Sequence, residues 1–177
     1  MNLLDSSRRL GELRAVELAC FRRLGERAPR LTPASCARWA SAAARAHAWR
    51  ASLLERLLPV SKGLPGWEEL TVVGDGPLGD ELARTLPESA GAPRVFPAGG
   101  GSSDTRPDSA LAFSDAGLEL VADLVGRLYP LLLDGYGSHL GACTEAADGA
   151  VMRMLGRAVA DLEVVRAEGS VLCQRAG

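Results

Sequence analysis

TPASCARWASAAARAHAWRASLLERLL, residues 32–58, has the apolar spacing of one long helix. Thr32 is suited to cap this helix and Pro33 to occupy its first turn, while Pro59 should end it. Its apolar face comprises Cys36, Trp39, Ala40, Ala43, Ala51, Leu54, Leu57 and Leu58. His47 falls on that same face. The stretch therefore predicts a core helix that directs a histidine inward.

The composition favours packed helices in one domain. The chain has 177 residues, of which 47% are hydrophobic and only 5% aromatic. A core built largely from Leu, Val and Ala suits an all-α fold, and this length can bury such a core without a disulfide or structural metal. We expect residues 1–177 to form a single helical domain.

Charge and cysteine spacing exclude several classes of partner. The net charge of −2 offers no basic surface for nucleic acid. The four cysteines show neither Cys-x-x-Cys nor zinc-ligand spacing, which indicates reduced thiols. The N-terminal segment lacks the features of a signal peptide, and no uncharged run is long enough to span a bilayer. We therefore expect a cytoplasmic protein with neither a nucleic-acid nor a membrane partner.

A first helix is expected at residues 6–27, with a carboxylate in its apolar face. Glu17 lies four residues after Leu13 and three before Cys20, so it is directed at the core. The connection to the next helix is short, which makes the first two helices antiparallel neighbours.

Residues 59–107 are rich in glycine, proline and serine and predict an irregular crossover. Within them, Gly74-x-Gly76-x-x-Gly79 matches the dinucleotide-binding fingerprint in letter. That fingerprint requires a βαβ unit with an acidic residue after its second strand, and the sequence supplies neither. We therefore expect no nucleotide site here, and we expect proteases to cut first between residues 98 and 106.

Two more helices are expected, at residues 114–140 and 148–168. Pro130 should kink the first of them. Two helices, a long connection and two further helices describe a four-helix bundle with one long crossover between helices two and three. In such a bundle those two helices run parallel, which explains the length of the connection.

Three segments carry a resemblance to a known superfamily. ELRAVELACFRRLGERAP, ARAHAWRASLLERLLP and LYPLLLDGYGSHLGACTEAADGAVMRMLGRAVADLEVVRAEG together resemble the ferritin-like four-helix bundles, of the actinobacterial type. The likeness covers all four helices. Members with a di-iron site use one glutamate from each of two helices and a Glu-x-x-His pair from each of the other two.

The resemblance implies a degenerate di-iron site. Glu17 matches the glutamate of helix one and His47 the histidine of helix two, but Ala44 stands where the paired glutamate belongs. Glu119, or Asp115 or Asp123 in its place, would be the glutamate of helix three. In helix four, Leu162 and Val165 replace the Glu and His positions, next to Asp161.

These matches suggest a metal-free polar centre between the helices that binds or transforms a small metabolite, in a specialised biosynthetic pathway. Glu17 and His47 are the candidate catalytic residues. The candidate substrate-binding residues are Trp39, Arg50, Glu119, Tyr129 and Asp161. One alternative is a non-haem iron oxygenase or hydroxylase with ligands from Glu17, His47, Glu119 and Asp161. Another is a non-catalytic interaction protein. A homodimer is possible under each of the three functions.

A purely structural explanation is available for each of these residues. Glu17 could meet His47, Arg50 or Arg157 in a structural polar cluster, because a buried carboxylate is costly unless it is paired. Tyr129 should be core, with a partner for its hydroxyl. We expect core and rim packing for Trp39 and Trp49 and an exposed position for His139.

Overall fold

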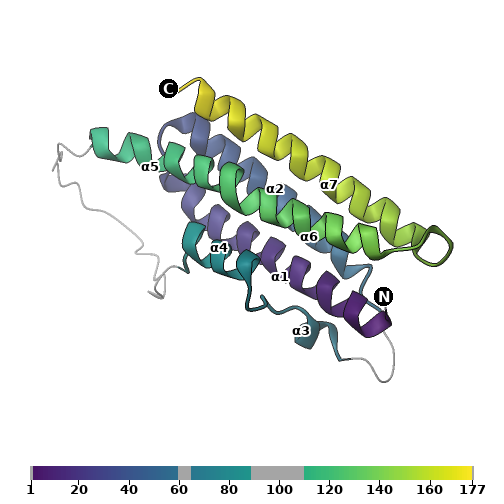
Figure 1. The fold of residues 1–177 in the computed structure, drawn as a ribbon. Helices are drawn as coiled ribbons and strands as arrows, with labels where there is room; N and C mark the ends of the chain where they lie inside the picture. The colour runs from purple at the N-terminus through teal and green to yellow at the C-terminus, as the bar shows by residue number, and fades with distance from the viewer. Residues whose placement is uncertain (1, 60–64, 89–109, 177) are drawn as a thin grey trace.

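The computed structural model describes residues 2–59, 65–88 and 110–176, and every regular element in these ranges is a helix. The predicted all-α class is therefore confirmed. Figure 1 shows the chain order α1 (Leu3–Arg27), η1 (Ala28–Arg30), α2 (Ala34–Glu55), α3 (Trp67–Leu70), α4 (Pro77–Thr85), α5 (Ala110–Asp123), η2 (Leu124–Leu128), α6 (Tyr129–Ala142) and α7 (Glu145–Gln174). Among these helices, none combines the length and apolar character needed to cross a bilayer.

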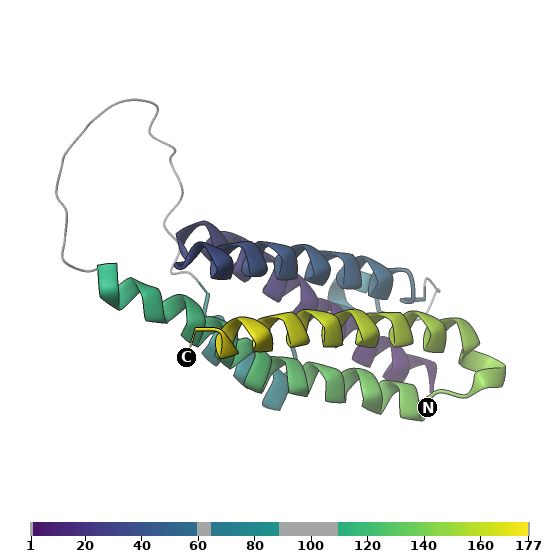
Figure 2. The same ribbon diagram turned by 90° about the horizontal axis from the view of Figure 1, so that it is seen from above.

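The long helices α1, α2, α6 and α7 run side by side (Figures 1 and 2). The turn η1 reverses the chain, so α1 and α2 are antiparallel neighbours as the short connection predicted. Helix α2 also packs against α7, and α6 packs against both α1 and α7. The core between them is built mainly from small and branched aliphatic side chains, including Leu10, Val16, Leu24, Ala40, Ala43, Leu54, Leu124, Leu132, Leu155 and Leu162.

Helix α2 is shorter than residues 32–58. Pro33, with an extended ψ of 170°, is its N-cap in place of Thr32, and its carbonyl accepts from the amide of Cys36. At the other end, the amide of Leu57 bonds the carbonyl of Leu54, which tightens the chain into a final turn before Pro59 is reached. The helix therefore ends at Glu55.

The crossover is not irregular throughout, so that expectation was wrong in its described part. Helix α4 is amphipathic and buries Leu82, and Leu86 directly after it is also buried. Arg23 of α1 donates to the carbonyl of Leu86 at 2.7 Å, and Arg27 donates to that of Thr85 at 3.2 Å. Helix α4 is thus fixed along α1. The segment expected to be cut first, residues 98–106, lies outside the described residues.

The glycine motif does not belong to a βαβ unit. Residues 71–74, which precede α4, form no strand. A Cβ atom at Gly79 would lie 2.3 Å from the carbonyl oxygen of Gly74. The last glycine therefore permits α4 to fold back closely on its own preceding loop.

The predicted third helix is a continuous helical segment made of α5, η2 and α6. Its irregularity is the π-helical turn η2, in which the amide of Tyr129 bonds the carbonyl of Leu124. Pro130 has no N–H group for an ordinary helical bond, and the π turn just before it widens the helix at that point. The fourth helix, α7, is longer than residues 148–168 in both directions.

Candidate functional site

Glu17, near the middle of α1, is the hub of a buried hydrogen-bonded cluster. Its side chain is completely buried. One carboxylate oxygen lies 2.5 Å from Nδ1 of His47. The other accepts from Nε of Arg50 at 2.8 Å and from the hydroxyl of Tyr136 at 2.6 Å. Helices α1, α2 and α6 therefore meet on one carboxylate, and the expected contact between Glu17 and His47 is present.

His47 connects this carboxylate to Tyr129. The pKa of His47 is lowered by burial, which favours the neutral ring. Nδ1 of His47 lies 2.5 Å from the Glu17 carboxylate and 2.9 Å from Nη2 of Arg50, a group that can only donate. We assign the proton to Nδ1 because the contact to the ionised carboxylate is the shorter of the two, and Nε2 then accepts from the Tyr129 hydroxyl, 3.1 Å away. The result is a directed chain of hydrogen bonds from Tyr129 through His47 to Glu17.

Arg50 places a positive charge between two carboxylates. Its guanidinium is fully buried and bonds Glu17 of α1 through Nε and Asp161 of α7 through Nη1. The Asp161 side chain is 35% exposed, so the cluster reaches the surface at this residue. We call Glu17, His47, Arg50, Tyr129, Tyr136 and Asp161 the polar centre.

The protonation states in the polar centre follow from burial and from Arg50. Burial alone would raise the pKa of Glu17, but Arg50 and His47 together outweigh burial and lower that pKa to about 2. Burial raises the pKa of both Tyr129 and Tyr136 well above 10, so both remain neutral donors. The centre therefore holds one buried ion pair, with the second carboxylate at the surface.

The other predicted binding residues divide between the core and the solvent. Trp39 packs beside Tyr129, with ring centroids 6.3 Å apart, and donates to the carbonyl of Val165. Glu119 is exposed on α5, and no hydrogen bond or ion pair joins it to the polar centre. Its assignment to substrate binding stays a prediction. Gly117 and Val121 face the core on either side of it, which turns Glu119 to the opposite side of α5.

Two aromatic or imidazole side chains were misjudged from the sequence. His139 is completely buried, whereas the sequence predicted an exposed position. Its Nε2 lies 3.4 Å from the hydroxyl of Ser6, so α1 packs against it. Tyr136 was not identified at all. It lies four residues after the buried Leu132 and seven after Tyr129, and extending the apolar face of that helix by one turn would have found it.

The donor set does not fit an iron site. Among the described residues, no group of three or more His, Cys, Asp and Glu side chains lies together as metal ligands. The guanidinium of Arg50 lies between the carboxylates of Glu17 and Asp161, and Glu119 is exposed on α5. The alternative ligand set of Glu17, His47, Glu119 and Asp161 is therefore not assembled.

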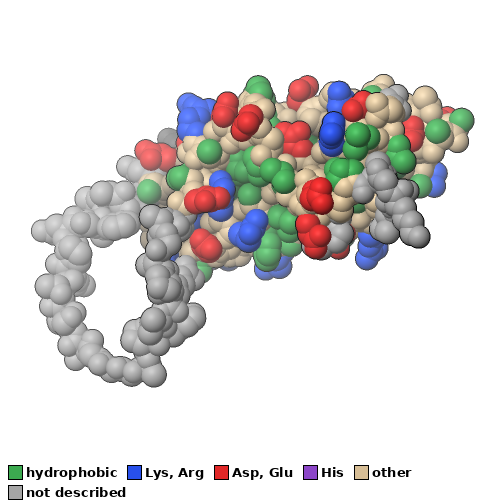
Figure 3. Space-filling model, turned by 90° about the horizontal axis from the view of Figure 1, so that it is seen from below, with side chains coloured by type: hydrophobic (Ala, Val, Ile, Leu, Met, Phe, Trp, Pro, Cys, Tyr) green, Lys and Arg blue, Asp and Glu red, His purple; other side chains and the backbone are tan. Residues whose placement is uncertain are grey.

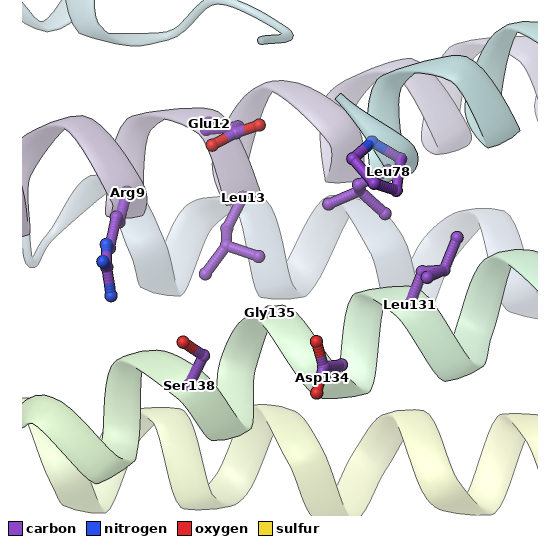
Figure 4. Close-up of a pocket in the computed structure, with 9 residues that line it drawn as sticks. Arg9, Glu12, Leu13, Leu78, Leu131, Asp134, Gly135 and Ser138 are labelled. Carbon is purple, nitrogen blue, oxygen red and sulfur yellow. The ribbon is translucent and has the colours of Figure 1, made fainter. Parts of the chain in front are cut away.

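A separate cleft of about 260 Å³ lies between α1, α4 and α6 (Figure 4). Its lining residues are Arg9, Glu12, Leu13, Pro77, Leu78, Leu131, Asp134, Gly135 and Ser138. None of them belongs to the polar centre. The face in Figure 3 interleaves acidic, basic and hydrophobic side chains, and its described residues form no continuous basic surface for nucleic acid.

The buried polar centre and the open cleft are thus the two features that any functional assignment must explain. Comparisons of the chain with models of protein families, with curated proteins and with solved structures find no match to any of them.

Proposed function

We propose that this chain is a metal-independent, small-molecule-binding member of the ferritin-like four-helix bundles, with its crossover between α2 and α5. The observation that carries the proposal is the position of Arg50. This buried cation lies between carboxylates from α1 and α7, at the heart of the helices. A guanidinium there supplies the positive charge that metal ions supply in the di-iron members of the superfamily.

Electrostatics supports this reading of Arg50. An isolated carboxylate in the core costs several kcal/mol, roughly, and this cost is offset only by good ion-pair geometry and further hydrogen bonds. Glu17 has both, through Arg50, His47 and Tyr136. With its charge already compensated, the centre has no electrostatic need for a metal cation.

The closed state of the polar centre suggests that ligands bind elsewhere on the bundle. Five of its six side chains are completely buried, and Asp161 alone reaches solvent. We therefore assign Glu17 and His47 to positioning of α1, α2 and α6 rather than to contact with substrate. The concave cleft between α1, α4 and α6 offers a small molecule the access that the centre lacks.

Elemental analysis tests the metal-independent part of this proposal. We expect protein purified from iron-supplemented cells to contain substoichiometric iron and manganese, and an Arg50→Met variant to contain no more. The exposed Arg157 of α7 provides the matched control, Arg157→Met. A full pair of metal ions in every wild-type chain would overturn the proposal.

Thermal-shift measurements test the small-molecule part. The probes are a panel of L-amino acids, aliphatic carboxylic acids, hexoses and nucleoside triphosphates. A ligand that binds only the folded chain raises the melting temperature, and the increase grows with ligand concentration. We expect at least one class to produce this shift. Complete absence of a shift across the panel would contradict the proposed function.

A further inference from the structure

We propose that the cleft between α1, α4 and α6 binds a small zwitterion of the aliphatic α-amino acid class. This inference rests on the proposed small-molecule function and names its site and ligand. The order of charged and apolar side chains along the cleft carries it. Figure 4 shows Arg9 at one end, Leu78 at the other, and Glu12 and Asp134 on opposite walls between them.

The floor of the cleft is kept open by a glycine. Gly135 of α6 faces Leu13 of α1, and a Cβ atom at Gly135 would lie only 3.1 Å from Cδ2 of Leu13. A side chain at this position would require Leu13 to shift and would take up space between the two helices. The glycine thus allows close packing beneath the cleft without closing it.

The walls are fixed by contacts outside the cleft. Tyr136, next to Gly135, bonds Glu17, which lies one turn along α1 from Leu13. The carbonyls at the end of α4 are held by arginines of α1, including the bond from Arg27 to Pro87 at 2.9 Å. The cleft is therefore largely preformed, which reduces the entropy lost on binding.

Three charged groups around the cleft are available to a ligand. Arg9, Glu12 and Asp134 form no hydrogen bond or ion pair with another residue in the described parts of the chain. Two carboxylates and one guanidinium give the cleft a net negative charge. They favour a ligand that carries an ammonium group and also offers a carboxylate to the single arginine.

The spatial order matches an amino acid. A ligand carboxylate at Arg9 places the ammonium between Glu12 and Asp134. The aliphatic side chain then extends toward Leu78 and Leu131, where it loses water against apolar surface. The volume of about 260 Å³ is below the usual range for drug-sized ligands and suits a compact molecule of this kind.

The same charges argue against a nucleotide at the glycine motif. A Cβ atom at Gly74 would lie 2.7 Å from Oε1 of Glu12, so this carboxylate sits against the glycine-rich turn before α4. A phosphate at that turn would meet a negative charge at close range. The glycines here allow close packing of the loop onto α1.

Isothermal titration with L-leucine tests the inference directly. Its comparators are L-leucinamide, which lacks the carboxylate, 4-methylpentanoate, which lacks the amine, and glycine, which lacks the side chain. We expect saturable binding of L-leucine and about tenfold or greater weakening for each comparator, since each loses one group of contacts. ATP should not compete.

Variants assign the contacts. Arg9→Gln and Asp134→Asn should each weaken L-leucine binding by about tenfold or more, with unchanged far-ultraviolet circular dichroism. Glu163→Gln and Arg157→Gln, on the exposed side of α7, are the matched controls and should bind as the wild type does. Ser138→Phe, at the exposed rim, should block the cleft without disturbing the core.

Two results would overturn the inference: no saturable binding of L-leucine, or equal binding of L-leucinamide with no effect of Arg9→Gln. If L-leucine fails while another panel compound raises the melting temperature, the ligand class is wrong and the proposed function stands. If no compound of the panel binds, both the ligand class and the proposed small-molecule function are wrong.

Discussion

Arg50 is the residue on which the interior most depends. Removing its guanidinium would leave Glu17 as an uncompensated buried charge. We expect Arg50→Met to lower the free energy of unfolding by about 3–5 kcal/mol, measured by urea denaturation. Arg157→Met, on the exposed face of α7, should change it by less than about 0.5 kcal/mol.

A double variant separates the ion pair from simple packing. Glu17→Gln combined with Arg50→Met removes both charges, so the double variant should be more stable than the sum of the two single losses predicts. Additive losses would show that the two residues do not act as a buried pair.

His47 gives the stability of the protein a pH dependence. Burial lowers its pKa from 6.5 in the folded chain, with Arg50 adding to the effect and Glu17 opposing it. The unfolded chain therefore binds a proton at higher pH than the folded chain does, and the free energy of unfolding falls as the pH drops below about 6.5. One ring contributes at most about 1.4 kcal/mol per pH unit.

Urea titrations between pH 7.5 and pH 5.5 check this expectation. His47→Gln should flatten the slope. The pKa of His139, the second of the chain's two histidines, is also lowered by burial, so the double variant with His139→Gln should abolish most of the remainder. This interval lies above the range from 4.5 to about 2 in which protonation of Glu17 begins to remove its own contribution. A wild-type slope that survives both substitutions would refute the assignment.

Burial of a side chain is easier to predict from the sequence than the identity of the residues that it contacts. Glu17 and His47 were predictable because each interrupts an apolar face of helical period. Their further partners were not, since Arg50 and Arg157 both qualified as partners of Glu17. Only the close packing of α1 against α2, with Arg157 exposed on α7, selects Arg50. A one-turn underestimate of an apolar face was enough to miss Tyr136.

At the scale of elements, substitution of alanine for either of two glycines in α1 should have opposite effects on the free energy of unfolding. A Cβ atom at Gly11 would lie 2.1 Å from the carbonyl oxygen of Leu70 in α3, whereas Gly25 has open space. Gly25→Ala should raise the free energy of unfolding by about 0.5–1 kcal/mol. Gly11→Ala should lower it by about 1 kcal/mol or more, because backbone cannot move aside cheaply.

Thermal and urea unfolding of both variants measure the difference. The two positions share helix type and substitution, so intrinsic helix propensity cancels in the comparison. A stabilised Gly11→Ala variant would mean that α3 does not pack on α1 as described.

The long helices could be predicted from the sequence, but the residues at which they end could not. Apolar periodicity over many residues predicts that a helix is present. The ends of α2, at Pro33 and Glu55, depend on individual backbone hydrogen bonds that the apolar pattern does not reveal. The packing of α4 was harder to predict than a short helix after the glycine motif, because a nine-residue amphipathic helix within glycine-rich sequence depends on α1 to stabilise it.

At the scale of the whole molecule, stability should be insensitive to chelators. Arg50 pairs with both Glu17 and Asp161, and under the proposed function no bound metal would contribute to the folding free energy. We expect the melting temperature to be the same with and without EDTA. A drop of several degrees on chelation, reversed by adding iron or manganese, would contradict this expectation.

The buried cation of this molecule is the side chain of Arg50, so it is present as soon as the polypeptide has been made. Arg50 and its two carboxylate partners, Glu17 and Asp161, all belong to the same polypeptide. Under the proposed metal-independent function, the pairing of these charges would need no ion from solution. Folding alone would then complete the interior, and the chain would need no separate step in which a metal is loaded.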